Sequence, residues 1–444
     1  MPSTTASARW SRATTSSRDR GHSRRSASPP GRAVSAPAQE RSSWFQETFA
    51  ALGVRHFRVL WIGTLFAFLA FFMSTVVQSV VAFQLTGSNS AVGFVVFAQG
   101  VAMCLLGPLG GAMADRLPKR RVIASCQLLT TGVFFGLATV MATGAITVAW
   151  LALGSMLMGV TFAFLGPTRQ AFVVELVPDA MRGNAVALSG VANNASRAVG
   201  PALAGVMLAW AASGATGAYL VMGSLYAISL LTVLALPHSP PRSNVRDTQV
   251  LEDIVVGLRY VRDHRRLRLL VLLFMLVIML GFPHVTLLPG LVENALGRRA
   301  ESVSVLFSLS AIAALVTSLL VARKADSASG VAIFSALGLG FGISLLLLAL
   351  APTFEIAILA MLVLGATSGG FQALGMAMVM RETEPLFAGR VMALTMMAFG
   401  GFGLVGLPVG FLGDAVGERA TLVGMAAVVC AVVLWLRSAL ARTR

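Results

Sequence analysis

Long apolar runs separated by short polar loops dominate this chain and limit what it can fold into. Only 12% of the residues are charged, against about a quarter in a soluble domain. Each run is long enough to cross a bilayer as a helix, which takes about 20 residues. We count twelve such runs, at 58–85, 90–114, 121–143, 146–168, 184–211, 215–236, 267–291, 302–322, 329–350, 355–380, 390–412 and 419–437. The sequence therefore predicts an all-α membrane protein with twelve transmembrane helices.

A polar linker divides the runs into two groups of six. Residues 44–236 are predicted to form an N-terminal six-helix bundle that starts with a short interfacial helix, and residues 267–444 a C-terminal six-helix bundle. Residues 1–43, rich in Ser, Arg, Pro and Ala, predict a disordered basic cytoplasmic tail. The linker at 237–266 predicts an amphipathic helix. Its apolar stripe consists of Leu251, Ile254, Val255, Leu258 and Val261.

The distribution of cations predicts the orientation of the helices. With the N-terminus in the cytoplasm, 30 of the 34 Lys and Arg fall on the cytoplasmic side, and only Arg298, Arg299 and Arg419 fall outside. Such a bias over short loops indicates topology, so we expect a multi-pass protein of the plasma (inner) membrane with both termini cytoplasmic. The cations are spread over loops and tails, so the net charge of +16 does not indicate a nucleic-acid partner.

A short internal repeat relates the two groups of runs. Gly183-Asn184-Ala185-Val186-Ala187-Leu188 enters the fifth run, and Gly389-Arg390-Val391-Met392-Ala393-Leu394 enters the eleventh. The two copies lie 206 residues apart at both ends. Similar halves in parallel are typical of a two-lobed transporter.

The stretch from Gly110 to Arg121, between the second and third runs, resembles the signature between helices 2 and 3 of the major facilitator superfamily. The matching positions are Gly111, Asp115, Arg116, Lys119, Arg120 and Arg121, and Pro118 stands where the signature has a second glycine. Residues 166–172 and 183–205 are similar to one subgroup, the enterobactin-exporter-like and macrolide-efflux-like drug exporters.

This resemblance implies the major facilitator fold, with two pseudo-symmetric bundles, and secondary active transport by alternating access. It also implies that Asp115 faces the start of helix 11 near Arg390, where a helix N-terminus favours an anion. The signature residues would then form a gating latch between the lobes. The alternative interpretation is a positively charged cytoplasmic loop that contains a single acid.

Arg197 is the only cation that falls deep within an apolar run. It lies about 20 Å along the predicted fifth helix, and a charge near the membrane midplane is costly and usually functional. Asn193 precedes it by one turn and shares its face. Two interpretations remain open. Arg197 lines a substrate cavity and favours an anionic or carbonyl-rich group, or it has a structural role, in which it satisfies backbone carbonyls that Pro201 leaves free or braces neighbouring helices.

Other polar or small residues extend the list of candidates. The further cavity candidates are Gln78, Gln99, Gln372 and His284. Gly200, Pro201 and Gly205 partly resemble the helix-5 motif of drug:proton antiporters and are predicted to serve helix packing. All 18 Asp and Glu fall in loops, tails or helix ends. Proton coupling would therefore use a carboxylate at the membrane edge, such as Asp115, Glu293, Glu355 or Asp414, or it would use His284 or another group.

These features favour a secondary transporter that exports hydrophobic or amphipathic small molecules and works as a monomer, with protons as the candidate coupling ion. An importer of a small solute and a non-transporting membrane receptor or scaffold are the alternatives. The three cysteines are scattered within apolar runs and have no metal-ligand spacing. We therefore expect no metal, no cofactor and no enzymatic activity.

Overall fold

The chain is an all-α membrane protein. The computed structural model describes residues 49–210, 214–237, 250–321 and 329–442, with the side chains of 108, 111–116 and 250–254 excepted. These residues contain helices and no strand. The predicted tail at 1–43 lies outside the described residues, as does the start of the predicted interfacial helix, of which Ala50–Gly53 forms a short 3-10 helix.

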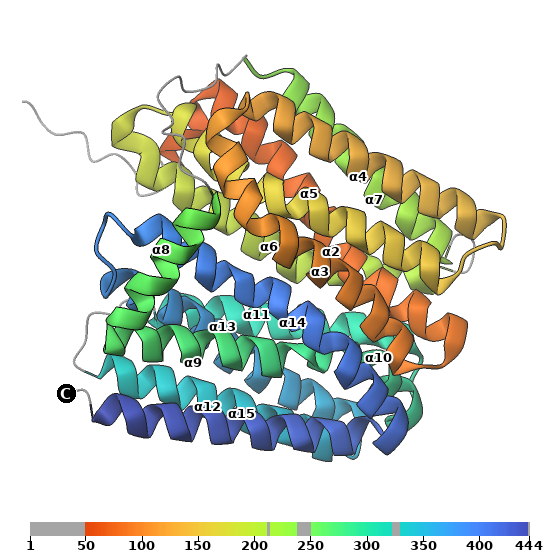
Figure 1. The fold of residues 1–444 in the computed structure, drawn as a ribbon. Coiled ribbons are helices and arrows are strands. Elements are labelled where there is room, and N and C mark those ends of the chain that lie inside the picture. The colour runs from red at the N-terminus through yellow and green to blue at the C-terminus, as the bar shows by residue number, and fades with distance from the viewer. Residues whose placement is uncertain (1–48, 211–213, 238–249, 322–328, 443–444) are drawn as a thin grey trace, which may run out of the picture. The chain divides into compact units, whose positions relative to one another are not determined.

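Six long helices precede the linker and six follow it (Figure 1). The N-half consists of α2 (Arg55–Thr86), α3 (Asn89–Arg116), α4 (Lys119–Ala142), α5 (Val148–Glu175), α6 (Arg182–Ala209) and α7 (Gly214–Leu234). The C-half consists of α9 (Arg265–Gly281), α11 (Val303–Val321), α12 (Gly330–Leu350), α13 (Phe354–Arg381), α14 (Ala388–Val416) and α15 (Glu418–Ala441).

Eleven helices in the described residues are long and apolar enough to cross a membrane. The twelfth long helix, α6, has 28 residues but is not among them. Asn193, Asn194 and Arg197 lower its hydropathy. A membrane helix tolerates such residues when they face other helices or water rather than lipid, so the composition of α6 predicts that one of its faces points inward.

The seventh predicted run, 267–291, is not one continuous α-helix. Helix α9 ends at Gly281 and is followed by a 3-10 segment, Phe282–Thr286, and then by a π-helical turn, Leu291–Ala295. Pro283 and Pro289 explain the interruption, because proline lacks the backbone donor that an α-helix needs.

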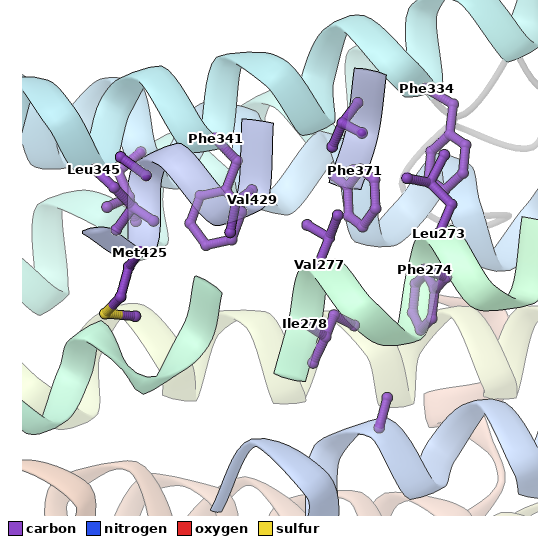
Figure 2. Close-up of a cluster of buried hydrophobic side chains, with 14 of the residues drawn as sticks. Leu273, Phe274, Val277, Ile278, Phe334, Phe341, Leu345, Phe371, Met425 and Val429 are labelled. Carbon is purple, nitrogen blue, oxygen red and sulfur yellow. The ribbon is translucent and has the colours of Figure 1, made fainter. Parts of the chain in front are cut away.

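Each half has its own hydrophobic core. In the C-half, Phe334 stacks on Phe371 with ring centroids 4.5 Å apart, and Phe371 stacks on Phe274 at 6.0 Å (Figure 2). In the N-half, Phe134 packs against Tyr219 and Tyr226. Because the two cores are largely separate, the halves can change their mutual contacts without unpacking either core.

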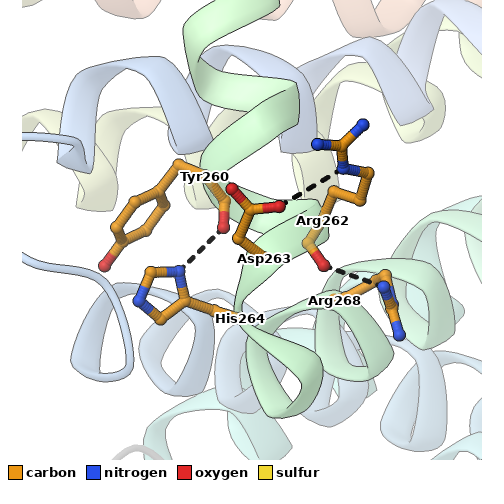
Figure 3. A network of polar contacts seen from close by, with 5 residues as sticks. All are labelled: Tyr260, Arg262, Asp263, His264 and Arg268. Carbon is orange, nitrogen blue, oxygen red and sulfur yellow. Dashed lines mark hydrogen bonds and ion pairs between the residues drawn. The ribbon is translucent and has the colours of Figure 1, made fainter.

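The linker forms helix α8 (Val250–Asp263), which contacts α14, α9 and α3. Tyr260 stacks on Phe387 with centroids 4.1 Å apart, and its hydroxyl accepts a hydrogen bond from the Glu384 backbone N–H at 3.1 Å. Figure 3 shows the turn into α9, where His264 Nδ1 lies 2.8 Å from the Tyr260 carbonyl oxygen and Arg268 donates to the Arg262 carbonyl at 2.8 Å. These contacts fasten α8 to the C-half.

Two names locate positions along the helices. The linker end is the end of the long helices at which α3 finishes at Arg116 and α14 begins at Ala388. The far end is the opposite end, at which α3 begins at Asn89 and α14 finishes at Val416.

Candidate functional site

Helices α3 and α14 join the two halves through glycine-to-glycine contact. A Cβ atom built on Gly403 would lie 2.6 Å from Gly100 Cα and 2.9 Å from the Val96 carbonyl oxygen. One built on Gly93 would lie 2.6 Å from the Gly406 carbonyl oxygen. The two backbones therefore touch, an approach that only very small residues permit. We call this contact, from Asn89 to Cys104 on α3, the α3–α14 seam.

A carboxylate from the C-half caps the first turn of α3 at the far end. Asp414 accepts hydrogen bonds from Ser88 Oγ at 2.7 Å, from the Asn89 backbone N–H at 2.7 Å and from the Ser90 backbone N–H at 2.9 Å. A helix N-terminus has unpaired N–H donors and a partial positive charge, so an anion is favoured there. Asp414 lies more than 300 positions further along the chain than Asn89, so this cap joins the C-half to the N-half.

A second carboxylate extends the same contact. Glu418, buried at the start of α15, accepts from Asn89 Nδ2 at 3.0 Å and from Asn294 Nδ2 at 2.8 Å. Gly417, with φ 88° and ψ 155°, makes the turn that places Asp414 and Glu418 on either side of Asn89. We call Ser88, Asn89, Ser90, Asp414 and Glu418 the far-end latch.

Sequence reasoning missed this latch. It named Asp414 only as a carboxylate at the membrane edge and gave no role to Glu418 or to Ser88–Ser90. Ser-Asn-Ser before an apolar run is a helix-start signal, so the uncapped turn could have been noticed. Its partner could not, because nothing local indicates which distant acid reaches it.

The structure describes only part of the latch that is predicted at the linker end. The backbone of Gly111, Asp115 and Arg116 belongs to the last turns of α3, but their side chains lie outside the described residues. The pairing of Asp115 with the start of α14 therefore stays a prediction.

Two other predicted linker-end residues make contacts within the N-half. Lys119 is buried and lies 2.9 Å from Glu175 Oε1, and Arg120 donates to the Leu234 carbonyl, so both join helices of the N-half. Arg121 is exposed. Arg390 packs over the Phe387 ring at 5.8 Å, and its Cβ lies near Gly257 of α8.

Arg197 lies near the middle of α6, on the side opposite two exposed valines. Val199 and Val206 are exposed, and they lie about 200° and 180° around the helix from Arg197. Ser196, about 100° to one side, donates to the Leu65 carbonyl of α2 at 3.2 Å. Gly205, about 80° to the other side, packs against Ser304 of α11. Arg197 therefore points between a helix of the N-half and a helix of the C-half.

The Arg197 guanidinium has no partner within the described part of the chain. Its side chain is half-buried, as is that of Asn193, and neither a hydrogen bond nor an ion pair reaches it from any described residue. In particular, it donates to none of the carbonyls around Pro201. Part of the Arg197 side chain therefore stays accessible beside the described residues.

Two of the other cavity candidates, Gln78 and His284, make their contacts inside their own half. Gln78 is buried between α2 and α5, where its Nε2 lies 3.3 Å from Met158 Sδ and its Oε1 accepts from Ser155. His284 is 3% exposed, and its Nδ1 lies 2.8 Å from the Gly281 carbonyl oxygen. Gln99 and Gln372 are half-buried. Gln78 and His284 are thus already occupied by protein contacts.

The segment that contains Gly200, Pro201 and Gly205 lies in two helix contacts. A Cβ on Gly200 would lie 2.8 Å from Phe72 Cβ on α2, and one on Gly205 would lie 2.6 Å from Ser304 Cβ on α11. The small residues of this segment therefore let α6 approach both halves.

Arg169 is a buried cation that sequence reasoning treated only as part of a motif. It is 5% exposed and lies over the Phe68 ring at 5.2 Å. Its Nε and one terminal nitrogen have no hydrogen-bond partner among the described residues. Its position, six residues before the end of α5, resembles that of a positively charged loop flank, which is why the sequence alone did not single it out.

The comparison with known proteins agrees with this architecture. Residues 46–444 match a major facilitator family described as "transmembrane secretion effector". The Staphyloferrin A transporter of Staphylococcus aureus is 28% identical over 269 residues, which are 60% of this chain and 66% of that protein. The chain thus spans just under two thirds of that relative.

Solved structures with a similar fold are transporters as well. The nucleoside transporter NupG has a TM-score of 0.70 at 16% identity and covers 86% of this chain and 98% of its own. The human organic anion transporter MFSD10 has a TM-score of 0.61 at 18% identity, with 86% and 99% covered. A bacterial homologue of the human lysosomal transporter Spinster, described as inward-facing and unoccupied, has a TM-score of 0.68 at 14% identity, with 88% and 98% covered. The chain therefore belongs to the major facilitator family of transmembrane secretion effectors.

Proposed function

We propose that this protein exports amphipathic small molecules from the cytoplasm by alternating access. The observation that carries the proposal is the way the halves meet. They touch through the far-end latch and through the α3–α14 seam, which runs from the far end past the middle of α3, while each half keeps its own core. Such a contact can part and re-form as a unit.

Two states follow from this contact. With the latch formed, substrate enters between the halves from the linker end, which the positive-inside bias places in the cytoplasm. When Asp414 and Glu418 leave Asn89, the halves part at the far end and release substrate outside. The family's description as a secretion effector supports this direction.

Aromatic and thioether side chains support an amphipathic substrate. Phe71 of α2 stacks on Phe162 of α5 with centroids 4.8 Å apart, and Phe72 lies against Gly200 of α6. On the C-half, Met279 of α9 packs against Gly401 of α14. These half-buried groups offer polarizable surface on both sides of the contact.

Proton coupling is part of the proposal. Three described carboxylates accept hydrogen bonds across the two halves: Asp414 and Glu418 in the far-end latch, and Glu301, which accepts from Gln84 Nε2 at 3.0 Å. A carboxyl group that binds a proton loses acceptor capacity, so protonation there would weaken the latch and favour the outward-open state.

Transport by purified protein in liposomes tests the proposal. Vesicles with the linker end outward should accumulate a fluorescent amphipathic dye, and a pH gradient should change the initial rate. Accumulation of dye only in vesicles of the opposite orientation would indicate import and overturn the direction. Absence of transport across a broad dye panel, for protein with a normal melting temperature, would overturn the function.

A further inference from the structure

The middle of the membrane contains a positive charge and no negative one in the described residues. Arg197 lies fifteen residues after the start of α6 and twelve before its end. The Asp and Glu whose side chains are described all lie at helix ends or in loops, at Glu175, Asp179, Asp263, Glu293, Glu301, Glu355, Glu382, Glu384, Asp414 and Glu418. The described part of the chain therefore supplies no carboxylate at the depth of Arg197.

From this imbalance we infer that Arg197 binds an anionic group of the transported molecule, so that the substrates are organic anions. The inference rests on the proposed function and adds the charge of the substrate to it. A cation within a membrane costs several kcal/mol unless it is paired or hydrated. A bound anion provides the missing pair.

The position of Arg197 suits this role in three respects. It lies opposite the exposed Val199 and Val206 on α6. It lies between the face of α6 on α2 and the face on α11, and it keeps accessible surface. Planar guanidinium groups bind carboxylates through two parallel hydrogen bonds. A ligand held there would touch both halves, as a transported molecule must.

The neighbourhood also indicates what else the anion carries. Gly200, one turn beyond Arg197, packs against Phe72, whose ring lies edge-on to Phe71 at 5.4 Å. Phe71 in turn stacks on Phe162. A small inorganic anion at Arg197 would not reach these rings, so the fitting ligand has an aromatic or aliphatic body beside its negative group.

Arg169 shows what a structural arginine looks like in the same protein. It is 5% exposed, and it packs over Phe68 inside the N-half near Cys126 and Tyr226. Arg197 differs because it is accessible and lies between the halves. Burial and position, not residue type, therefore single out Arg197 as a ligand residue.

The test compares an anionic and a cationic dye in oriented proteoliposomes. Wild-type protein should transport carboxyfluorescein, and Arg197→Gln should raise its KM by about tenfold or more, the value of a charged hydrogen bond. Arg197→Lys keeps the charge and should retain most of the transport. Arg182→Gln is the matched control, because Arg182 lies on the same helix, is exposed and pairs only with Asp179 in the described residues, at 2.7 Å.

Melting curves of each variant separate a ligand role from a folding role. If Arg197→Gln does not fold, a shift of the wild-type melting temperature by carboxyfluorescein that Arg197→Lys largely keeps supports the inference, and no shift overturns it. Unchanged KM for carboxyfluorescein in folded Arg197→Gln overturns it too. Transport of rhodamine 6G but not carboxyfluorescein by wild type overturns the anion inference and leaves export standing, whereas transport of neither dye overturns both.

Discussion

Replacing Gly403 by alanine should force the far end apart. The new Cβ would lie 2.6 Å from Gly100 Cα, 2.9 Å from the Val96 carbonyl oxygen and 3.0 Å from the Gly100 nitrogen. All three are backbone atoms of α3, so no side-chain rotation can relieve the clash. Ordinary carbon contacts are about 3.5–4.0 Å, and the helices must therefore separate by about 1 Å.

The expected free-energy change follows from the size of that overlap. Overpacking by one methyl group costs about 1–3 kcal/mol. This cost applies only where α3 and α14 touch, so it destabilises the latched state relative to the parted one. The ratio of latched to parted molecules should fall by about 5-fold to 150-fold.

Cys104 offers a natural reporter for this change. Its Sγ lies in the α3–α14 seam, 2.6 Å from where a Cβ on Gly400 would be. In a background with Cys126→Ser and Cys430→Ser, a membrane-impermeant maleimide added at the far end should label Cys104 faster in Gly403→Ala than in the parent. The control is Gly424→Ala on α15, where a new Cβ meets no atom within 4 Å.

An unchanged labelling rate in folded Gly403→Ala would refute this reasoning. It would mean either that the seam does not control access at the far end or that the backbones accommodate a methyl group without parting. Gly100→Ala separates these two cases, because its Cβ would approach the Gly400 carbonyl oxygen and Gly403 Cα at 2.7 Å from the opposite helix.

Three further changes test other parts of the structure. Asp414→Ala removes three hydrogen bonds across the halves, so it should favour the parted state by about 1.5–3 kcal/mol and speed far-end labelling of Cys104; slower labelling would contradict the capping role. Gly417→Ala forces φ 88° and ψ 155° on a residue with a Cβ, which should cost about 1–3 kcal/mol and lower the melting temperature, whereas an unchanged melting curve would argue against that backbone conformation. Lys119→Met leaves Glu175 without its 2.9 Å ion pair; because Glu175 is partly exposed, we expect a loss of about 2 kcal/mol, less than a fully buried pair would give, with recovery in Lys119→Met/Glu175→Gln measured by thermal melting.

The sequence predicted the helices better than their contacts, for a physical reason. Apolar length decides what crosses a bilayer, so the all-α membrane fold was confirmed, and the resemblance to the major facilitator superfamily was confirmed by the family match. The drug-exporter subgroup stays part of the proposed function. The break after Gly281 could have been read from Pro283 and Pro289, whose effect is local.

Contacts between distant segments were much harder to predict. Gly100 and Gly403 are ordinary glycines in a chain that has 44 of them, and only folding brings them together. Likewise, nothing in the sequence around Asp414 or Asn89 indicates that the two residues pair. Arg197 was found because a charge in an apolar run is conspicuous, but its direction depends on which faces of α6 meet α2 and α11.

The polar composition of α6 also affects how the protein is made. An arginine at the centre of a membrane helix opposes insertion by about 2.5–3.5 kcal/mol on the scale of the cellular insertion machinery. During synthesis α6 emerges after α2, whose Leu65 carbonyl can already receive Ser196, but before α11 and its Ser304 exist. The polar face of α6 therefore contacts only helices of the N-half until α11 of the C-half has been made. The helix that presents Arg197 to the interior thus makes the assembly of the first half depend on the arrival of the second.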